Sequence, residues 1–247
     1  MTIESEQDLA GLREIGHIVA LALHEMRQHV RPGVTTAELD AIGAEVLAQH
    51  GANSAPQAVY DFPGATCISL NHVAAHGIPG DRVIRKGDLV NVDVSAELNG
   101  YFADTAATIP VPPISADADR LCRCAQDALA RAIAVARVGV PLNEIGRAVE
   151  ETASEYGLEV IRNLPGHGIG RTLHEKPQVL NFYHPRANQR LSEGMVFTIE
   201  PFLSLGASSV DKGGDGWALI TADGSLAAQY EHTIVVTRGE PLVLTQL

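Results

Sequence analysis

A repeat at a nearly constant offset runs through the chain of 247 residues and constrains its fold more than any other feature. Residues of the segment 31–51 recur 106 positions later, as the pairs Arg31 and Arg137, Gly33 and Gly139, Val34 and Val140, Glu38 and Glu144, and Gly51 and Gly157. An apolar segment with an acidic residue follows each copy, and there Gly87 and Asp93 match Gly194 and Glu200 at an offset of 107. A shared offset over two kinds of element predicts internal duplication, with halves at about residues 1–110 and 111–247.

Each half begins with an expected helical hairpin. Apolar residues recur at helical spacing over residues 5–30, and Thr35 with Glu38 forms a capping box that opens a second helix ending at Gly51. In the second half, we expect one helix from Ser115 to Gly139 and another from Pro141 to Gly157. The short, proline-rich segment 110–115 between the halves indicates that both share one core, so we predict a single catalytic domain over residues 1–247.

Sequence typical of strands follows each hairpin. The expected strands cover residues 89–94, 101–109, 195–200, 217–221 and 232–236, and the Asn99-Gly100 turn joins the first two. Helical hairpins combined with strand hairpins predict an α+β fold.

Composition and charge exclude several classes of protein. The 18 basic residues against 30 acidic ones give a net charge of −12, which repels nucleic-acid backbones and anionic membranes. The first residues carry no basic signal region, and no apolar run reaches the roughly 18 residues of a membrane span. We therefore expect a cytoplasmic protein without nucleic-acid or membrane partners, whose three cysteines are reduced thiols.

Four acidic residues lie in or beside expected strands: Asp93, Asp104, Glu200 and Glu231. Burial of an unpaired carboxylate is costly, so each needs a cation. For one such residue, a salt bridge to Arg or Lys is the ordinary explanation. For all four, the scarcity of basic residues in the same strands favours a shared metal site instead.

A glycine-rich segment, GHGIGRTLH, presents His167 and His174, and another histidine, His76, precedes Gly77. A lone histidine is more often a hydrogen-bonded structural residue, but glycines on both sides permit the close approach that a metal ligand needs. Carboxylates with one imidazole and no thiolate suit Mn, Fe, Co or Zn. Four acids and one histidine are sufficient for two ions, which indicates metal-assisted hydrolysis.

Five motifs resemble those of the type I methionine aminopeptidases: Asn71 to Pro79, Asn91 to Val94, Gly166 to Gln178, Phe197 to Pro201 and Gln229 to Thr233. The resemblance runs from the first expected helix to the last strand. It implies a pita-bread fold, in which two pseudo-symmetric halves surround a dinuclear metal centre. It also implies two divalent ions, drawn from Co, Mn, Fe, Zn or Ni, and removal of the N-terminal methionine from peptides and from nascent chains near the ribosome.

The resemblance also implies a role for each site residue. Asp93 and Asp104 would chelate one ion, His167 would bind the other, and Glu200 and Glu231 would complete or bridge them. As catalytic residues, Glu200 would take a proton from the attacking water, His174 would hydrogen-bond the scissile peptide or its oxyanion, and His76 would position the substrate amide.

Phe62, Cys67 and Trp217 fall where relatives form the methionine pocket. Val59 and Leu173 fall where many relatives have Tyr and Phe, which predicts a less aromatic wall and softer methionine selectivity. Compensating repacking is the alternative explanation of these two differences.

Two other functions remain open. One is a hydrolase of the same fold that acts on X-Pro or on a broader set of N-terminal residues. The other is a metal-free binding module, which would lack ligands, whereas the ligand positions of this sequence are all filled.

Overall fold

Both expected helical hairpins are present in the computed structural model, which describes all 247 residues. The first pairs α1 (Glu6–His29) with α2 (Thr36–Gln49), and the second pairs α4 (Ala116–Val135) with α5 (Asn143–Tyr156). Thr35 and Glu38 form the predicted capping box at the start of α2. The helix α4 ends before Gly139 because Val138 and Gly139 donate backbone hydrogen bonds to Thr237 and Leu191.

One eleven-stranded antiparallel sheet joins the two halves. Its main path runs β1-β4-β5-β13-β9-β7-β8, and β2, β6, β10 and β14 pair beside this path. The strands of the sheet are β1 (Asn53–Ser54), β2 (Cys67–Leu70), β4 (Leu89–Leu98), β5 (Tyr101–Pro110), β6 (Glu159–Val160), β7 (Gly166–Gly168), β8 (Glu175–Val179), β9 (Val196–Ile199), β10 (Phe202–Ser204), β13 (Ala227–Val235) and β14 (Leu242–Val243). The β5–β13 pairing is the seam between the halves. A smaller sheet contains β11 (Val210–Lys212), β12 (Leu219–Thr221) and β3 (Val73–Ala75).

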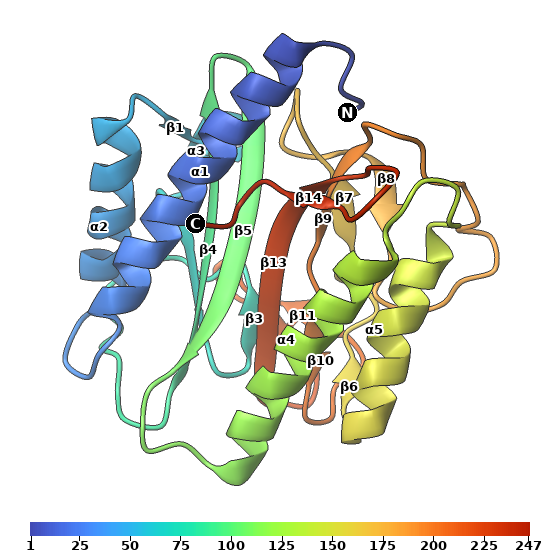
Figure 1. Cartoon of the computed structure of the whole chain (residues 1–247). Coiled ribbons are helices and arrows are strands. Elements are labelled where there is room, and N and C mark those ends of the chain that lie inside the picture. Colours follow the sequence, from blue (N-terminus) through green and yellow to red (C-terminus); the bar gives the residue numbers. More distant parts are fainter.

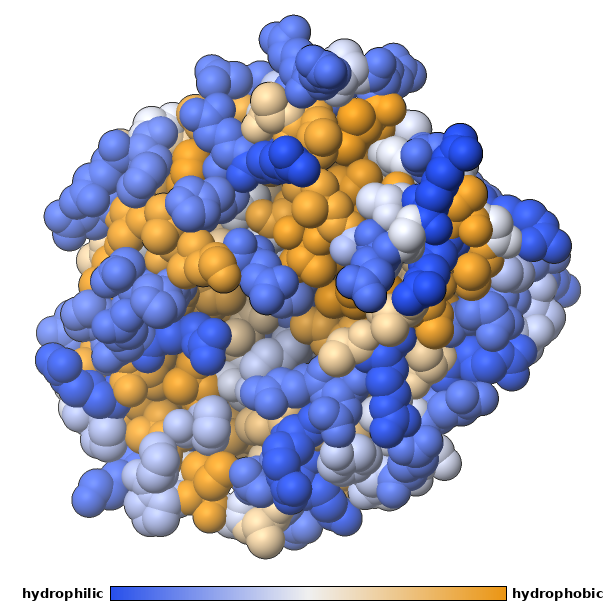
Figure 2. All heavy atoms as spheres, viewed as in Figure 1, coloured by the Kyte–Doolittle hydropathy of each residue, from blue (hydrophilic) through white to orange (hydrophobic).

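The long helices α1 and α4 lie on one face of the large sheet, with α2 and α5 outside them (Figure 1). Side chains alternate between the two faces of β4, so that Val90, Val92 and Val94 lie in the core shared with these helices. Asp93 and Ser95 therefore point to the opposite face. Seen from the helical side, hydrophilic side chains dominate the outer surfaces of the helices and hydrophobic atoms appear between them (Figure 2).

The α+β prediction is confirmed, and the differences from the sequence analysis are local. The short helix α3 (Ala55–Tyr60) was not anticipated. Glu231 lies inside β13, whereas Trp217 lies in the turn before β12. None of the helices combines the length and the apolar character required to cross a membrane.

Candidate metal centre

Three acidic side chains share one face of the sheet across the seam between the halves. Asp93 of β4 and Glu231 of β13 are both register partners of Ala106 on β5. Asp104 lies two residues from Ala106 and so points to the same face. Because alanine has a small side chain, the three carboxylates can converge over it.

Glu200 and His167 complete the group from the other half. Glu200 directly follows β9, where Thr198 donates a hydrogen bond to its Oε1 at 2.7 Å. The backbone N–H of His167 donates to the same threonine hydroxyl at 3.1 Å. One threonine of β9 thus contacts both the carboxylate of Glu200 and the backbone of His167.

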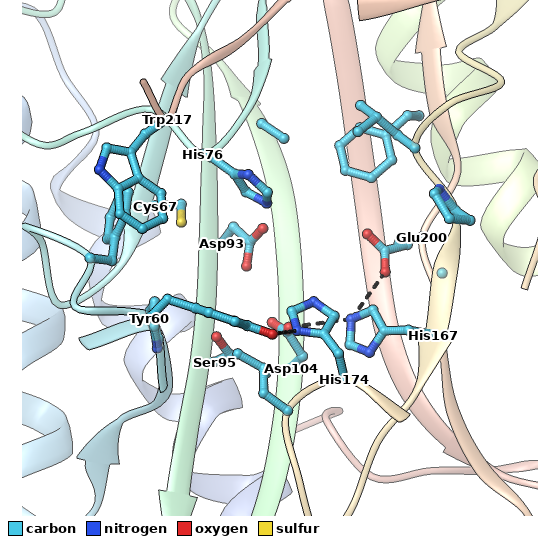
Figure 3. A pocket seen from close by; sticks show the side chains of 18 of the residues that line it. Tyr60, Cys67, His76, Asp93, Ser95, Asp104, His167, His174, Glu200 and Trp217 are labelled. Carbon is cyan, nitrogen blue, oxygen red and sulfur yellow. Dashed lines mark hydrogen bonds and ion pairs between the residues drawn. The ribbon is translucent and has the colours of Figure 1, made fainter. Parts of the chain in front are cut away.

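The ring of His167 faces the carboxylates. Its Nε2 lies 3.5 Å from Glu200 Oε1 and 3.9 Å from Asp104 Oδ2, as Figure 3 shows from close by. Its Nδ1 lies 3.0 Å from the carbonyl oxygen of Gly168. A carbonyl can only accept, so Nδ1 carries the proton and Nε2 is left as a free ligand atom.

Burial and mutual repulsion disfavour negative charge on these carboxylates, a cost that a bound cation would relieve. Burial raises the pKa of Asp93 to about 6 and that of Glu200 to about 8. Burial, together with the charges of the neighbouring carboxylates, also raises the pKa values of Asp104 and Glu231 well above the usual range. Burial lowers the pKa of His167 to about 3, so its ring is neutral.

No arginine or lysine forms an ion pair with these five side chains, which contradicts a salt-bridge explanation of the acids. Asp104 Oδ1 and Glu231 Oε1 are buried without any hydrogen-bond partner. Ligand atoms of Asp104, His167 and Glu231 lie within 4.8 Å of one another. Oxygen and imidazole donors at this spacing fit a divalent metal ion, and no thiolate takes part.

A cavity of about 590 Å³ opens beside the cluster. Its lining contains Asp93, Asp104, His167 and Glu200 together with apolar and aromatic side chains. The expected pocket residues Phe62, Cys67 and Trp217 all line it, as do His76 and His174. The cavity is thus polar at the acidic cluster and apolar beyond it.

The apolar wall combines residues from both halves. Phe62 and Trp217 meet edge to face, with ring centroids 5.2 Å apart. Cys67 is the register partner of Asp93, which places the thiol next to the acidic cluster. On α2, Asp40 accepts hydrogen bonds from the backbone of Ala65 and Thr66 and so fixes the approach to Cys67.

Two further imidazoles border the cavity. The ring of His174 lies 4.1 Å from that of His167, centroid to centroid, and its Nδ1 lies 2.7 Å from the hydroxyl of Tyr60. Burial and the nearby charge of His76 lower the pKa of His174. His76 has a left-handed backbone (φ 54), which directs its side chain out of the strand β3 and towards Asp93 (Figure 3).

The prediction about Val59 is wrong. Its side chain is 43% exposed and does not line the cavity. Its neighbour Tyr60 lines the cavity instead, because α3 ends there and turns that ring inward. Leu173 does line the cavity, so the wall lacks one expected aromatic residue and not two. A sequence signal for Tyr60 existed in Ser54 and Pro56, which mark the start of a short helix.

Residues 10–238 match metallopeptidase family M24. The chain belongs to this family. It is 46% identical over 249 residues to methionine aminopeptidase 2 of Bacillus subtilis (strain 168), with 100% of both chains covered.

Solved structures agree with this membership. Methionine aminopeptidase from Thermotoga maritima superposes with a TM-score of 0.97 at 34% identity, covering 100% of each chain. The Rickettsia prowazekii enzyme gives 0.94 at 38% identity, over 99% of this chain and 100% of that one. The architecture is therefore the pita-bread fold that the sequence motifs implied.

Proposed function

We propose that this M24 metallopeptidase removes the N-terminal methionine from peptides and nascent chains. The observation that carries the proposal is a cluster of four carboxylates and one imidazole, all but Asp93 buried, without a cationic partner and beside an apolar cavity. Relatives that match over their whole length and carry the name methionine aminopeptidase support it.

The cluster suits two divalent ions. We assign Asp93 and Asp104 to one ion, His167 to the other, and Glu200 and Glu231 to positions that complete or bridge them. Four carboxylates are more than a single ion needs for neutralisation, and this excess supports a pair. When bound, the ions lower the pKa of a nucleophilic water and polarise the scissile carbonyl.

Three side chains of the protein supply the remaining catalytic functions. Glu200 accepts the proton of the attacking water, because the hydroxyl of Thr198 holds its carboxylate at the edge of the cavity, beside His167. His174 donates a hydrogen bond to the scissile carbonyl as negative charge develops on its oxygen. His76, which also lines the cavity, orients the substrate amide.

The residues that line the cavity determine which N-terminal side chain fits. A methionine side chain adapts its three torsions to an irregular apolar space such as that between Phe62, Cys67 and Trp217. The free α-amino group has to approach the acidic cluster, so a residue in front of methionine or an acetyl group blocks binding. Newly made chains begin with methionine, and we therefore propose action in the cytoplasm near the ribosome, where the three free thiols stay reduced.

The whole chain of 247 residues forms one catalytic domain in this proposal, with halves at about residues 1–110 and 111–247. A large hydrophobic core that includes residues of both halves supports it, as does the β5–β13 seam. Neither half contains a complete set of ligands.

One observation favours a second candidate function, an aminopeptidase of broader specificity. Leu173 offers a smaller and more deformable surface to the cavity than an aromatic ring does. A non-catalytic binding module receives no such support, because unpaired buried carboxylates are costly to retain without a metal.

A panel of tripeptides that differ only in the first residue tests the proposal. Met-Ala-Ser should be among the fastest substrates of the metal-loaded protein, and acetyl-Met-Ala-Ser should resist. Met-Pro and Ala-Ala peptides test the alternatives. If Met-Ala-Ser is cleaved more slowly than most of the panel, the methionine assignment is wrong and only an unspecified peptidase remains.

A further inference from the structure

Tyr60 makes the sole hydrogen bond to the imidazole of His174. Its hydroxyl lies 2.7 Å from Nδ1, and the two ring centroids are 5.5 Å apart. The imidazole also lies against the ring of His167, with the two ring centroids 4.1 Å apart. Figure 3 shows the hydroxyl of Tyr60 pointing at His174.

The position of Tyr60 is fixed by the end of α3. Asp61 has a left-handed backbone (φ 56) and donates its N–H to the carbonyl of Gln57, which closes the helix directly after Tyr60. At the other end, Ser54 caps the helix and donates its hydroxyl to the carbonyl of Ala65 at 2.7 Å. The tyrosine is therefore attached to a short rigid element, although 44% of its surface is exposed.

We infer that Tyr60 is a positioning residue that holds His174 in the tautomer whose proton is on Nε2. The inference rests on the role proposed above for His174 as a hydrogen-bond donor to the substrate. A neutral imidazole has one N–H and one acceptor nitrogen, so only one ring nitrogen can donate. A donor to Nδ1 leaves the proton on Nε2, the nitrogen remote from Tyr60.

The phenol is suited to this work. A tyrosine hydroxyl, with an ordinary pKa of about 10, remains a donor at neutral pH, and burial raises the pKa of Tyr60 further. Without the hydroxyl, the isolated imidazole can exchange tautomers or rotate about its side-chain torsions. In part of the population, Nε2 then carries no proton to donate to the substrate.

Kinetics of a Tyr60→Phe variant test the inference on metal-loaded protein. The substitution keeps the ring and removes only the hydroxyl, so a residue that merely forms the pocket wall would leave both constants unchanged. We expect kcat for Met-Ala-Ser to fall about 3- to 10-fold, the range for one neutral hydrogen bond, with KM within about twofold. Metal content should be unchanged. Tyr183→Phe, on the loop after β8 and outside the lining of the cavity, is the matched control and should behave as wild type.

A double-mutant cycle shows whether Tyr60 acts through His174. In a His174→Ala background, Tyr60→Phe should have no further effect on kcat, because the group it positions is absent. The same fold-loss in both backgrounds would overturn the inference, and so would a Tyr60→Phe enzyme with wild-type kcat.

A spectroscopic readout makes the inference independent of activity. In zinc-loaded protein, the ¹⁵N chemical shifts of the His174 ring should indicate a proton on Nε2 in the wild type and a tautomer mixture in Tyr60→Phe. A proton on Nδ1 in the wild type would overturn the inference even if the kinetics agreed. If the wild-type protein lacked aminopeptidase activity, the proposed function would fail, whereas this measurement would still decide the tautomer.

Discussion

The imidazoles of His167 and His174 lie against each other, with centroids 4.1 Å apart and planes tilted by 48°. Their hydrogen bonds separate their roles. The Nδ1 of His167 donates a hydrogen bond to a backbone carbonyl, and its Nε2 faces the carboxylates. The Nδ1 of His174 is hydrogen-bonded to Tyr60. The first ring thus faces the acidic cluster, which supports its proposed role as a metal ligand, and we propose that the second ring meets the substrate.

Removal of the second imidazole should therefore separate catalysis from metal binding. We expect His174→Ala to retain its metal ions and to lower kcat by roughly 10²- to 10³-fold, the usual loss for one transition-state donor. Metal analysis of the purified protein and initial rates with Met-Ala-Ser measure both. His17→Ala, at an exposed position on α1, is the control. Loss of metal from His174→Ala would contradict the assigned role.

The acidic cluster predicts that activity depends on metal. Chelation should abolish peptidase activity, and added Mn, Fe or Co should restore it. Glu231→Gln should abolish the rise in Tm that added metal produces, a rise equivalent to about 2.7 kcal/mol when the metal is at 100 times its Kd. In the metal-free protein, the same variant should match or exceed the wild-type Tm, because it removes a buried unpaired carboxylate.

Asp81→Ala, at an exposed position without a side-chain hydrogen bond, provides the control for Glu231→Gln. It should leave metal binding, activity and Tm unchanged. A Glu231→Gln protein that is still stabilised by metal would remove this residue from the ligand set, and full activity of chelated wild-type protein would refute the metal-dependent mechanism.

The helices and the grouping of the acids could be predicted because their signals are local or repetitive. The capping box at Thr35 and Glu38 satisfies helix N–H groups within four consecutive residues, so its effect does not depend on the rest of the fold. The duplication places Asp93 and Glu200 at matching positions of the two halves. The repeat could not predict that Asp93 and Glu231 share Ala106 as a register partner. That register arises from strand pairing between the two halves.

The contact between Tyr60 and His174 could not be predicted for a related reason. These residues are 114 positions apart, and their contact depends on where a six-residue helix ends. A motif comparison assigned the aromatic position to Val59, and the neighbouring residue occupies the cavity because Asp61 adopts a left-handed conformation. Helix ends of this kind are the least determined by local sequence.

Close packing beside α5 predicts an unusual effect of a helix substitution. Gly→Ala inside a helix normally stabilises by about 1 kcal/mol. A Cβ at Gly146, however, would clash with the carbonyl oxygens of Phe182 and Leu180, which are backbone atoms. We expect Gly146→Ala to lower the free energy of unfolding by about 1 to 3 kcal/mol in urea titrations. Gly214→Ala, which meets open space, should be near neutral, and a stabilised Gly146→Ala would contradict the packing.

The cysteines predict a pH dependence of thiol reactivity. Burial raises the pKa of Cys122 to about 11 and that of Cys124 to about 12. Since the thiolate is the reactive form, iodoacetamide should modify neither residue in native protein near pH 8, and both should react after unfolding. The unfolded thiols titrate near 8.5, so the unfolded state binds fewer protons above that pH and stability should fall as pH rises. Mass spectrometry of the labelled protein checks the first point, and rapid native labelling would contradict it.

Leu173 provides a test of methionine selectivity from the cavity wall. Its side chain is 3% exposed and faces the same space as Phe62 and Trp217. A phenyl ring there narrows the pocket for branched side chains, whereas the unbranched methionine can adjust its torsions. We expect Leu173→Phe to raise the ratio of kcat/KM for Met-Ala-Ser over Leu-Ala-Ser, within the roughly 10- to 200-fold range of apolar pockets. Leu173→Ala should lower the same ratio.

The larger phenyl ring of Leu173→Phe in a packed wall should also lower the free energy of unfolding by about 1 to 3 kcal/mol. Leu247→Phe, at an exposed position, is the control and should change neither stability nor selectivity. Equal ratios in Leu173→Phe, Leu173→Ala and wild type would show that this wall does not select the substrate.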